Sequence, residues 1–240
     1  MDIPAPAPKH LGALALLAVS LALTACSGSG SPAVTPPVPR GNLFLNPGLE
    51  DGSAPWFSLD ETSGFARTEE QAHGGLASAL LQMRDPPQAE GAKVYYLVQE
   101  IASAEFPEVV KGFYRVENWQ KGTAKQYIQF AVIVFNPKNF PTSSPNWQIR
   151  YPLAGIDSPP FPIGNAQFRF LGTEEPAQGQ WVPFQANIKD DFERLWGRVP
   201  EDFEKIRVLF EVRWDDKEAG TVAAADVYYD DLYIGTASAD

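Results

Sequence analysis

Aromatic side chains beside planar polar groups are the residues of this chain that could do recognisable chemistry. Two-residue alternation places Trp119 on one face with Phe113, Arg115 and Glu117. An aromatic ring can stack on the C–H face of a sugar, while guanidinium and carboxylate groups hydrogen-bond its hydroxyls. Four more aromatic or planar polar candidates lie in segments whose prolines and charges predict loops: Trp147, Arg150, Tyr151 and Trp196. For the four Trp and Tyr rings, packing of a loop onto the core is the alternative.

Carboxylates are abundant, but their spacing does not predict a catalytic pair. The chain has 30 Asp and Glu residues, and adjacent pairs include Glu174-Glu175, Asp190-Asp191 and Asp215-Asp216. Neighbours in a strand point to opposite faces of the sheet, whereas glycoside hydrolysis needs two carboxyl groups facing one site. We therefore expect no catalysis, and an enzyme with an unrecognised carboxylate site remains the less favoured alternative.

Histidine and cysteine are too few for several other kinds of site. The chain has one Cys and two His, and only His73 lies beyond the first ten residues. A zinc site built from His and Cys, a disulfide framework and a Cys–His nucleophile are thereby excluded. The net charge of −11 excludes a nucleic-acid partner, because phosphate backbones require positive surfaces.

The N-terminal segment predicts export and membrane attachment. Lys9 and His10 precede an apolar run, residues 11–22, that is too short to span a bilayer but suits a signal peptide. The run ends in Leu-Thr-Ala-Cys26, which resembles the lipobox of bacterial lipoproteins. That resemblance implies removal of residues 1–25, lipidation of Cys26 and, because Ser27 follows, an outer-membrane location. Residues 26–41 are rich in Gly, Ser and Pro, which predicts a tether.

Residues 42–240 predict one all-β domain. Every aromatic residue lies after Arg40. In 205–214, Ile206 and Phe210 fall on an apolar face and Arg207 and Glu211 on a polar one, as a half-buried strand requires. Residues 126–135 are apolar on both faces, which predicts a central strand, and 190–196 allow a short helix. The pattern favours an antiparallel β-sandwich, or jelly roll, with further strands at 76–83, 93–101, 109–117, 147–152, 166–171, 180–188 and 226–234.

Three segments carry a family resemblance. Residues 42–52, followed by Pro55-Trp56, resemble the opening strand of carbohydrate-binding modules with a galactose-binding-like jelly roll. Residues 72–80 are similar to an early segment of those modules, residues 227–234 resemble their closing strand, and 180–184 are a weaker match. The order of the segments supports the fold more than it supports sugar binding, since one fold hosts many functions.

The resemblance also implies a structural calcium ion. In such modules the Glu of the opening motif and an Asp of the closing motif bind one Ca²⁺, with backbone carbonyls completing the shell. The matching residues here are Glu50 and either Asp230 or Asp231, with Asp230 preferred because it alternates with Leu232 and Ile234. Surface turns are the alternative role for these acidic residues.

The favoured function is a lipid-anchored β-sandwich of the cell envelope that binds a glycan without catalysis. Stacking would use Trp119, Trp147, Tyr151 or Trp196, with hydrogen bonds from Arg115, Glu117 or Arg150. The acidic chain favours a neutral glycan. The first alternative is an envelope assembly or adhesion protein that binds a protein partner.

Overall fold

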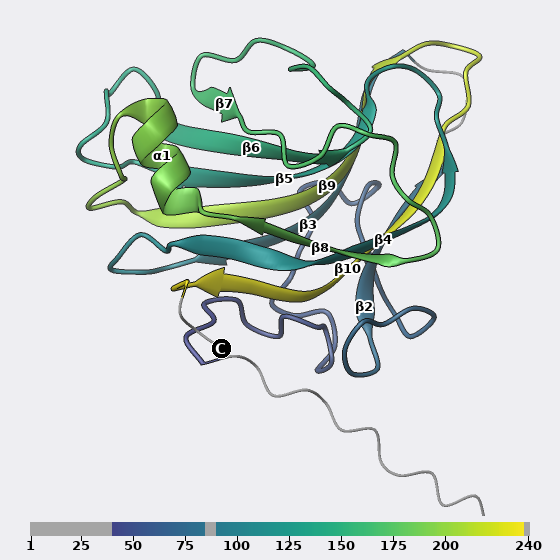
Figure 1. The fold of residues 1–240 in the computed structure, drawn as a ribbon, viewed down its shortest axis with the longest axis horizontal. Coiled ribbons are helices and arrows are strands. Elements are labelled where there is room, and N and C mark those ends of the chain that lie inside the picture. The colour runs from purple at the N-terminus through teal and green to yellow at the C-terminus, as the bar shows by residue number, and fades with distance from the viewer. Residues whose placement is uncertain (1–39, 85–89, 238–240) are drawn as a thin grey trace, which may run out of the picture. The chain divides into compact units, whose positions relative to one another are not determined.

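The computed structural model describes residues 40–84 and 90–237, which form ten strands and one helix (Figure 1). Five strands make the first sheet. Its order is β1 (Ala66–Thr68), β2 (Ser78–Arg84), β10 (Ala224–Gly235), β4 (Val109–Gln120) and β8 (Trp181–Ala186).

The second sheet also has five strands. Its order is β3 (Gly91–Ile101), β9 (Lys205–Lys217), β5 (Gln126–Phe135), β6 (Asn146–Ala154) and β7 (Ala166–Phe168). All neighbours in both sheets are antiparallel except β6 and β7, which are parallel. Successive strands from β2 to β5 alternate between the two sheets, so each sheet is assembled from segments distant in sequence.

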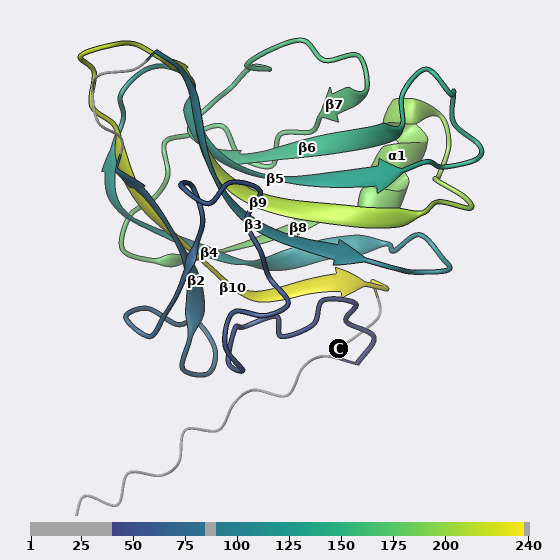
Figure 2. The same cartoon turned by 180° about the vertical axis from the view of Figure 1, so that it is seen from behind.

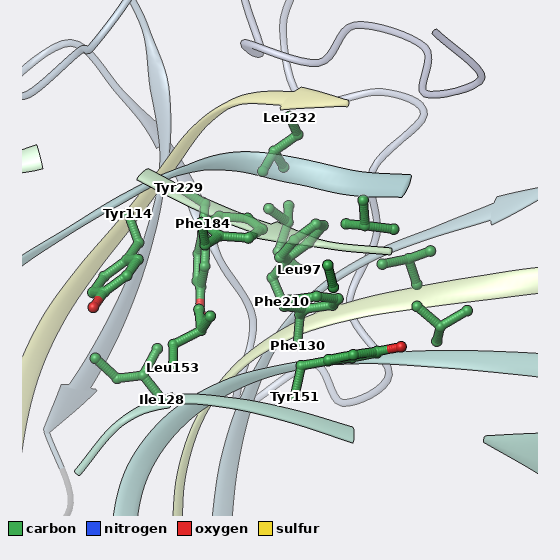
Figure 3. Packing of buried hydrophobic residues seen from close by; sticks show 14 of the residues in the cluster. Leu97, Tyr114, Ile128, Phe130, Tyr151, Leu153, Phe184, Phe210, Tyr229 and Leu232 are labelled. Atoms are coloured by element: carbon green, nitrogen blue, oxygen red, sulfur yellow. The ribbon is translucent and has the colours of Figure 1, made fainter. Parts of the chain in front are cut away.

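Apolar side chains from both sheets meet in one core (Figure 3). Phe210 of β9 is fully buried there, with ring centroids 6.1 Å from Phe184 of β8 and 5.1 Å from Tyr229 of β10. On β5, Phe130 stacks 4.6 Å from Tyr151 of β6. These contacts bury large aromatic surfaces, and burial of such surfaces is the main stabilising contribution in a sandwich of this kind.

One helix, α1 (Ile188–Trp196), closes an end of the core beside β5 and β6 (Figure 1). Its buried residues Ile188 and Phe192 join the core, and Phe192 packs edge-on against Phe106 at 5.1 Å. The helix ends at Gly197, whose φ of +72° is a left-handed conformation that favours glycine.

The fold class expected from the sequence, an all-β antiparallel sandwich, is confirmed. Strand β5 has the bounds predicted for it, and the other strands predicted from alternation and the helix are present with ends shifted by a few residues. Residues 42–52, which resemble an opening strand, form turns and bends instead of a strand. The three-residue strand β1 was not predicted, because so short an edge strand shows no clear alternation.

Candidate functional site

The outer face of the second sheet carries five planar polar side chains near its middle. Glu211 and Arg213 come from β9, Gln129 from β5, and Gln148 and Arg150 from β6. We call these five residues the polar centre. They alternate along their strands with apolar residues that face the first sheet. Figure 2 views this sheet from the side away from α1.

Strand pairing brings the polar centre together. Glu211 lies opposite Gln129 across the β9–β5 pair. Arg150 lies opposite Ala131, two residues further along β5, and Gln148 lies opposite Ile133. Because β5 lies between β9 and β6, Gln129 is placed between the residues of the two flanking strands.

The carboxylate of Glu211 is the hub of the cluster. Gln129 Nε2 donates to Glu211 Oε2, and Arg213 Nη1 donates to Glu211 Oε1 at 3.3 Å. Arg150 Nη1 lies 3.7 Å from Glu211 Oε2, and Arg150 Nε donates to Gln148 Oε1 at 3.1 Å. Glu211 is only 1% exposed, so these partners offset the large cost of burying its charge.

Arg213 is held in its charged form despite its burial. Burial disfavours the charge, but the carboxylates of Glu211 and Asp215 outweigh it and raise the pKa of the guanidinium. Arg213 Nη2 donates to Asp215 Oδ1 at 2.7 Å, and the Tyr127 hydroxyl donates to Asp215 Oδ2 at 2.5 Å. The polar centre therefore presents fixed, charged planar groups.

Two buried atoms of the polar centre have no hydrogen-bond partner among residues 40–84 and 90–237. One is an acceptor, Gln129 Oε1, and the other is a donor group, Arg150 Nη1. Gln129 reaches Glu211 Oε2 through Nε2, the atom bonded to the same carbon as Oε1, and Arg150 Nη1 itself lies 3.7 Å from Glu211 Oε2, so both atoms lie beside this carboxylate. Buried polar groups are rarely left unpaired, because each one costs about 1–3 kcal/mol.

Aromatic rings border the polar centre. Tyr96 of β3 lies opposite Glu211, and burial together with that carboxylate raises the pKa of its hydroxyl. The ring of Phe161, from the loop between β6 and β7, lies 5.6 Å from the guanidinium carbon of Arg150 and 5.6 Å from that of Arg213. Cation–π contacts of this kind are favourable within about 6 Å.

The structure does not gather the residues expected to bind a ligand. Of that set, Arg150 alone belongs to the polar centre. Residues 147–152 were predicted as a strand within a proline-rich segment expected to be mainly loop; the strand is confirmed, and Trp147 and Tyr151 lie in β6 and face the core, 7% and 0% exposed. Neither ring can stack on a ligand, because packing against the first sheet and α1 covers them.

Trp119 and Trp196 are half-buried and lie apart from the polar centre. Trp196 ends α1, packs edge-on to Trp147 at 4.7 Å and donates from Nε1 to the Gln148 carbonyl oxygen at 3.4 Å. Trp119, near the end of β4, donates from Nε1 to Glu175 Oε2 at 2.8 Å. Both indoles are thus engaged in fixing loops to the sandwich.

Arg115 and Glu117 lie on the opposite side of the sandwich, on the outer face of the first sheet. Arg115 Nη2 lies 2.5 Å from Glu117 Oε1, so the two charges satisfy each other. Trp181 is half-buried on this face, with its ring 5.7 Å from that of His73. His73 also stacks on Phe113 at 3.6 Å.

Sequence reasoning missed Gln129, Gln148, Glu211 and Arg213 as site residues. The signal available was Gln129, a polar residue in the middle of an otherwise apolar central strand. Glu211 was assigned to the polar face of its strand, which is correct, and the structure buries Glu211 and Arg213 on that face.

Oxygen ligands from both ends of the domain meet where the resemblance places calcium. A β-carbon added at Gly48 would lie 3.2 Å from Asp230 Oδ1 and 3.7 Å from Glu50 Oε1, so the two carboxylates flank this glycine. Asp231 instead contacts His73 Nδ1 at 2.6 Å. Glu50 and Asp230 therefore fit the donor chemistry of Ca²⁺ better than Asp231 does.

Asp230 is fully buried, and within the described part of the chain no Lys, Arg or His side chain forms an ion pair with it. Burial is the main cause that raises its pKa to about 7, although the backbone N–H groups of His73, Gly74 and Asp231 donate to it. Among the described residues, no three acidic, His or Cys side chains converge on one point. A calcium ion here would take its remaining oxygens from backbone carbonyls and water.

Cys26 and the expected signal peptide lie outside the described residues, as does the expected tether apart from residues 40 and 41. Within the described part of the chain, α1 is the only helix and is too short and polar to cross a bilayer.

No known protein-family model matches the chain, and no curated protein matches its sequence. Solved structures similar to it include carbohydrate-binding modules, as the sequence resemblance implied. One is the CBM22-1–CBM22-2 tandem domain from Paenibacillus barcinonensis Xyn10C, with 17% identity, coverage of 86% of this chain and 52% of that chain, and a TM-score of 0.46.

Two others are single modules. TmCBM61, solved with β-1,4-galactotriose, has 13% identity, 80% and 97% coverage and a TM-score of 0.43. CBM28, a non-crystalline cellulose specific module, has 12% identity, 83% and 98% coverage and a TM-score of 0.43.

Proposed function

We propose that this protein binds a glycan at the polar centre, without catalysis, while anchored to the cell envelope through Cys26. The single observation that carries the binding role is the unmatched pair Gln129 Oε1 and Arg150 Nη1. A hydroxyl group can accept a hydrogen bond from one nitrogen and donate its own hydrogen to an oxygen. A sugar hydroxyl between these atoms would satisfy both.

A neutral glycan fits the surroundings better than an acidic one. The protein has a net charge of −11, which repels acidic polymers as they approach. At the site itself, the charges of Arg150 and Arg213 face the carboxylates of Glu211 and Asp215. The cluster offers directional hydrogen bonds and little net charge.

The surroundings of Glu211 support binding without catalysis. Glycoside hydrolysis uses two carboxyl groups about 5 to 10 Å apart across the sugar. Glu211 is instead enclosed by the amide of Gln129 and the guanidinium groups of Arg150 and Arg213. A carboxylate in this arrangement positions other polar groups.

Two further features belong to the proposal. Calcium would be held by Glu50 and Asp230 and would join the first and last segments of the domain; its role there is structural. Lipidation of Cys26 would place the domain at the outer membrane, separated from it by the Gly-, Ser- and Pro-rich segment.

Substitution of Arg150 tests the binding role. The full-length protein is applied to a glycan array, and the affinity for the best neutral glycan is measured by calorimetry with calcium present. We expect Arg150→Gln to weaken binding about tenfold to a hundredfold, because a hydrogen bond to a charged group is worth about 1.5–3 kcal/mol.

Arg84→Gln is the matched control. Arg84 lies on the first sheet, where Nη2 pairs with Asp226 Oδ2 at 2.6 Å, so its loss should leave the affinity unchanged. Equal effects of the two substitutions, or no binding to any glycan by a folded monodisperse sample, would refute the proposal.

A further inference from the structure

The polar centre is covered by a segment of the same chain. Phe161 contacts Arg150 on β6 and Arg213 on β9 with the same ring, and β5 lies between those two strands. The ring therefore spans β5 above Gln129. This explains how Gln129 Oε1 and Arg150 Nη1 can be buried on an outer face of the sandwich without a hydrogen-bond partner.

The covering segment, residues 156–164, is fixed firmly at its N-terminal end. Lys121 Nζ donates to the Gly155 carbonyl oxygen at 2.8 Å, and Gly155 N donates to the Glu174 carbonyl oxygen at 2.7 Å. Gly155 has a φ of +91°, and a β-carbon there would lie 2.8 Å from the Gln126 carbonyl oxygen. Only glycine suits this position, where the chain turns out of β6.

The C-terminal end is fixed as well. Asn165 Nδ2 donates to Asn146 Oδ1 at 2.8 Å and to the Asn146 carbonyl oxygen at 3.1 Å. In the reverse direction, Gln148 N donates to the Asn165 carbonyl oxygen at 3.0 Å. These bonds hold Asn165 against the start of β6.

Between these two ends, residues 156–164 are attached to the sheet mainly by side-chain packing. Across residues 156–164, all of which the structure describes, the one hydrogen bond to the sheet runs from Ala166 N, at the start of β7, to the Ile163 carbonyl oxygen at 3.3 Å, and only Ile156 and Pro160 are buried. Phe161 contacts the two guanidinium groups and, at 5.8 Å, the ring of Phe168. Such contacts are weak enough to break and re-form without disturbing the strands.

We propose that residues 156–164 form a gate, and that Phe161 must leave Arg150 and Arg213 before a ligand can enter the polar centre. The inference rests on the proposed function, since it concerns access to the same site. Phe161 occupies the place where a ligand ring would meet the two guanidinium groups, so the free protein competes with its own ligand.

A gate of this kind lowers the apparent affinity. The dissociation constant is divided by the fraction of molecules in which the site is open, so removal of the competing ring strengthens binding. We expect Phe161→Ala to raise the affinity for the array-selected neutral glycan at least threefold, mainly through faster association. Phe170→Ala is the matched control, because Phe170 packs on Phe168 and has no contact of this kind with the arginines.

A second readout needs no ligand. Phenylglyoxal modifies accessible guanidinium groups, and mass spectrometry reports the rate at each arginine of the full-length protein. Modification at Arg150 and Arg213 should be several-fold faster in Phe161→Ala than in the wild type or in Phe170→Ala. Arg84, which is partly exposed on the other sheet, serves as the internal reference and should react at the same rate in all three proteins.

The two readouts separate failure of the gate from failure of the proposed function. Faster modification together with tighter glycan binding supports both. Faster modification without glycan binding by any variant supports the gate and overturns the proposed ligand. Unchanged modification, or weaker glycan binding by Phe161→Ala, overturns the gate; the latter result would make Phe161 part of the binding surface.

Discussion

Two buried carboxylates of this protein are stabilised in different ways. Glu211 faces guanidinium groups and an amide, so its charge is matched by side chains of neighbouring strands. Asp230 is equally buried but meets only backbone N–H groups and the like charge of Asp231. When no cation is bound, protonation of Asp230 is therefore expected to make the free energy of unfolding depend on pH.

The pKa of Asp230 predicts the sign of that dependence. It is about 7 in the folded protein and about 3.9 in an unfolded chain, so between these values the folded state binds a proton that the unfolded state does not. With chelator present, the free energy of unfolding should fall as the pH rises from about 4 to 7, by at most about 4 kcal/mol. Urea unfolding at each pH measures it.

Asp230→Asn should remove that fall, because the amide does not titrate. Asp51→Asn, which changes an exposed carboxylate in the opening segment, should keep it. Parallel pH profiles for the wild type and Asp230→Asn would show that another group is responsible.

At the scale of secondary structure, β9 has two roles because its faces have different neighbours. Its inner face supplies Phe210, whose ring lies near Phe44 and Trp56 of the opening segment as well as rings of both sheets. Its outer face supplies Glu211 and Arg213 to the polar centre. A rigid inner face keeps the outer side chains at fixed spacings.

Phe210→Ala should lower the free energy of unfolding by about 3–5 kcal/mol, because it leaves a cavity where several rings meet. Phe161→Ala removes the same number of atoms from a half-buried loop residue and should cost clearly less. Chemical denaturation of both variants measures the difference. A similar loss for the two would mean that the loop is a structural part of the core.

Strand β6 shows why the proline content of a segment does not by itself place Trp147 and Tyr151 in a loop. Seven prolines in residues 136–164 predict a loop, yet Pro152 is accommodated inside the strand. β7 pairs with β6 only opposite residues 148–150, so the missing N–H of Pro152 lies beyond that pairing. Proline is tolerated at such an edge, and the aromatic residues before it remain in the core.

Across the whole domain, the first and last described segments are bound to each other. Asn42 Nδ2 donates to the Leu232 carbonyl oxygen at 2.8 Å, and Leu43 N donates to the Ile234 carbonyl oxygen at 2.8 Å. Glu50 and Asp230 come together at the same junction. An ion at this point would close the sandwich by linking residues separated by most of the chain.

Calcium should therefore stabilise the whole domain. We expect saturating Ca²⁺ to raise the melting temperature of the wild type at pH 7 by several degrees, since a ligand that binds only the folded state shifts unfolding by mass action. Asp230→Asn and Glu50→Gln should lose most of this response, and Asp51→Asn should retain it. The calcium assignment fails if chelation leaves the wild-type melting curve unchanged.

The sequence by itself determined the strands and the fold class. Alternation with a period of two, interrupted by turn residues, specifies which segments are strands and which residues share a face. Residues 205–214 and 126–135 show this, since each corresponds to a strand of the second sheet. The proximity of Glu50 and Asp230 was also predicted, but from the resemblance to carbohydrate-binding modules and not from the alternation of apolar and polar residues.

Only the tertiary structure decided which residues make the site. Alternation divides a strand into two faces, but it does not say which loop covers the polar face or which side chains from other strands complete it. Glu211 is 82 residues from Gln129 in the chain, and Phe161 comes from another segment again. Their proximity follows from strand order and register, which depend on long-range packing that no local pattern contains.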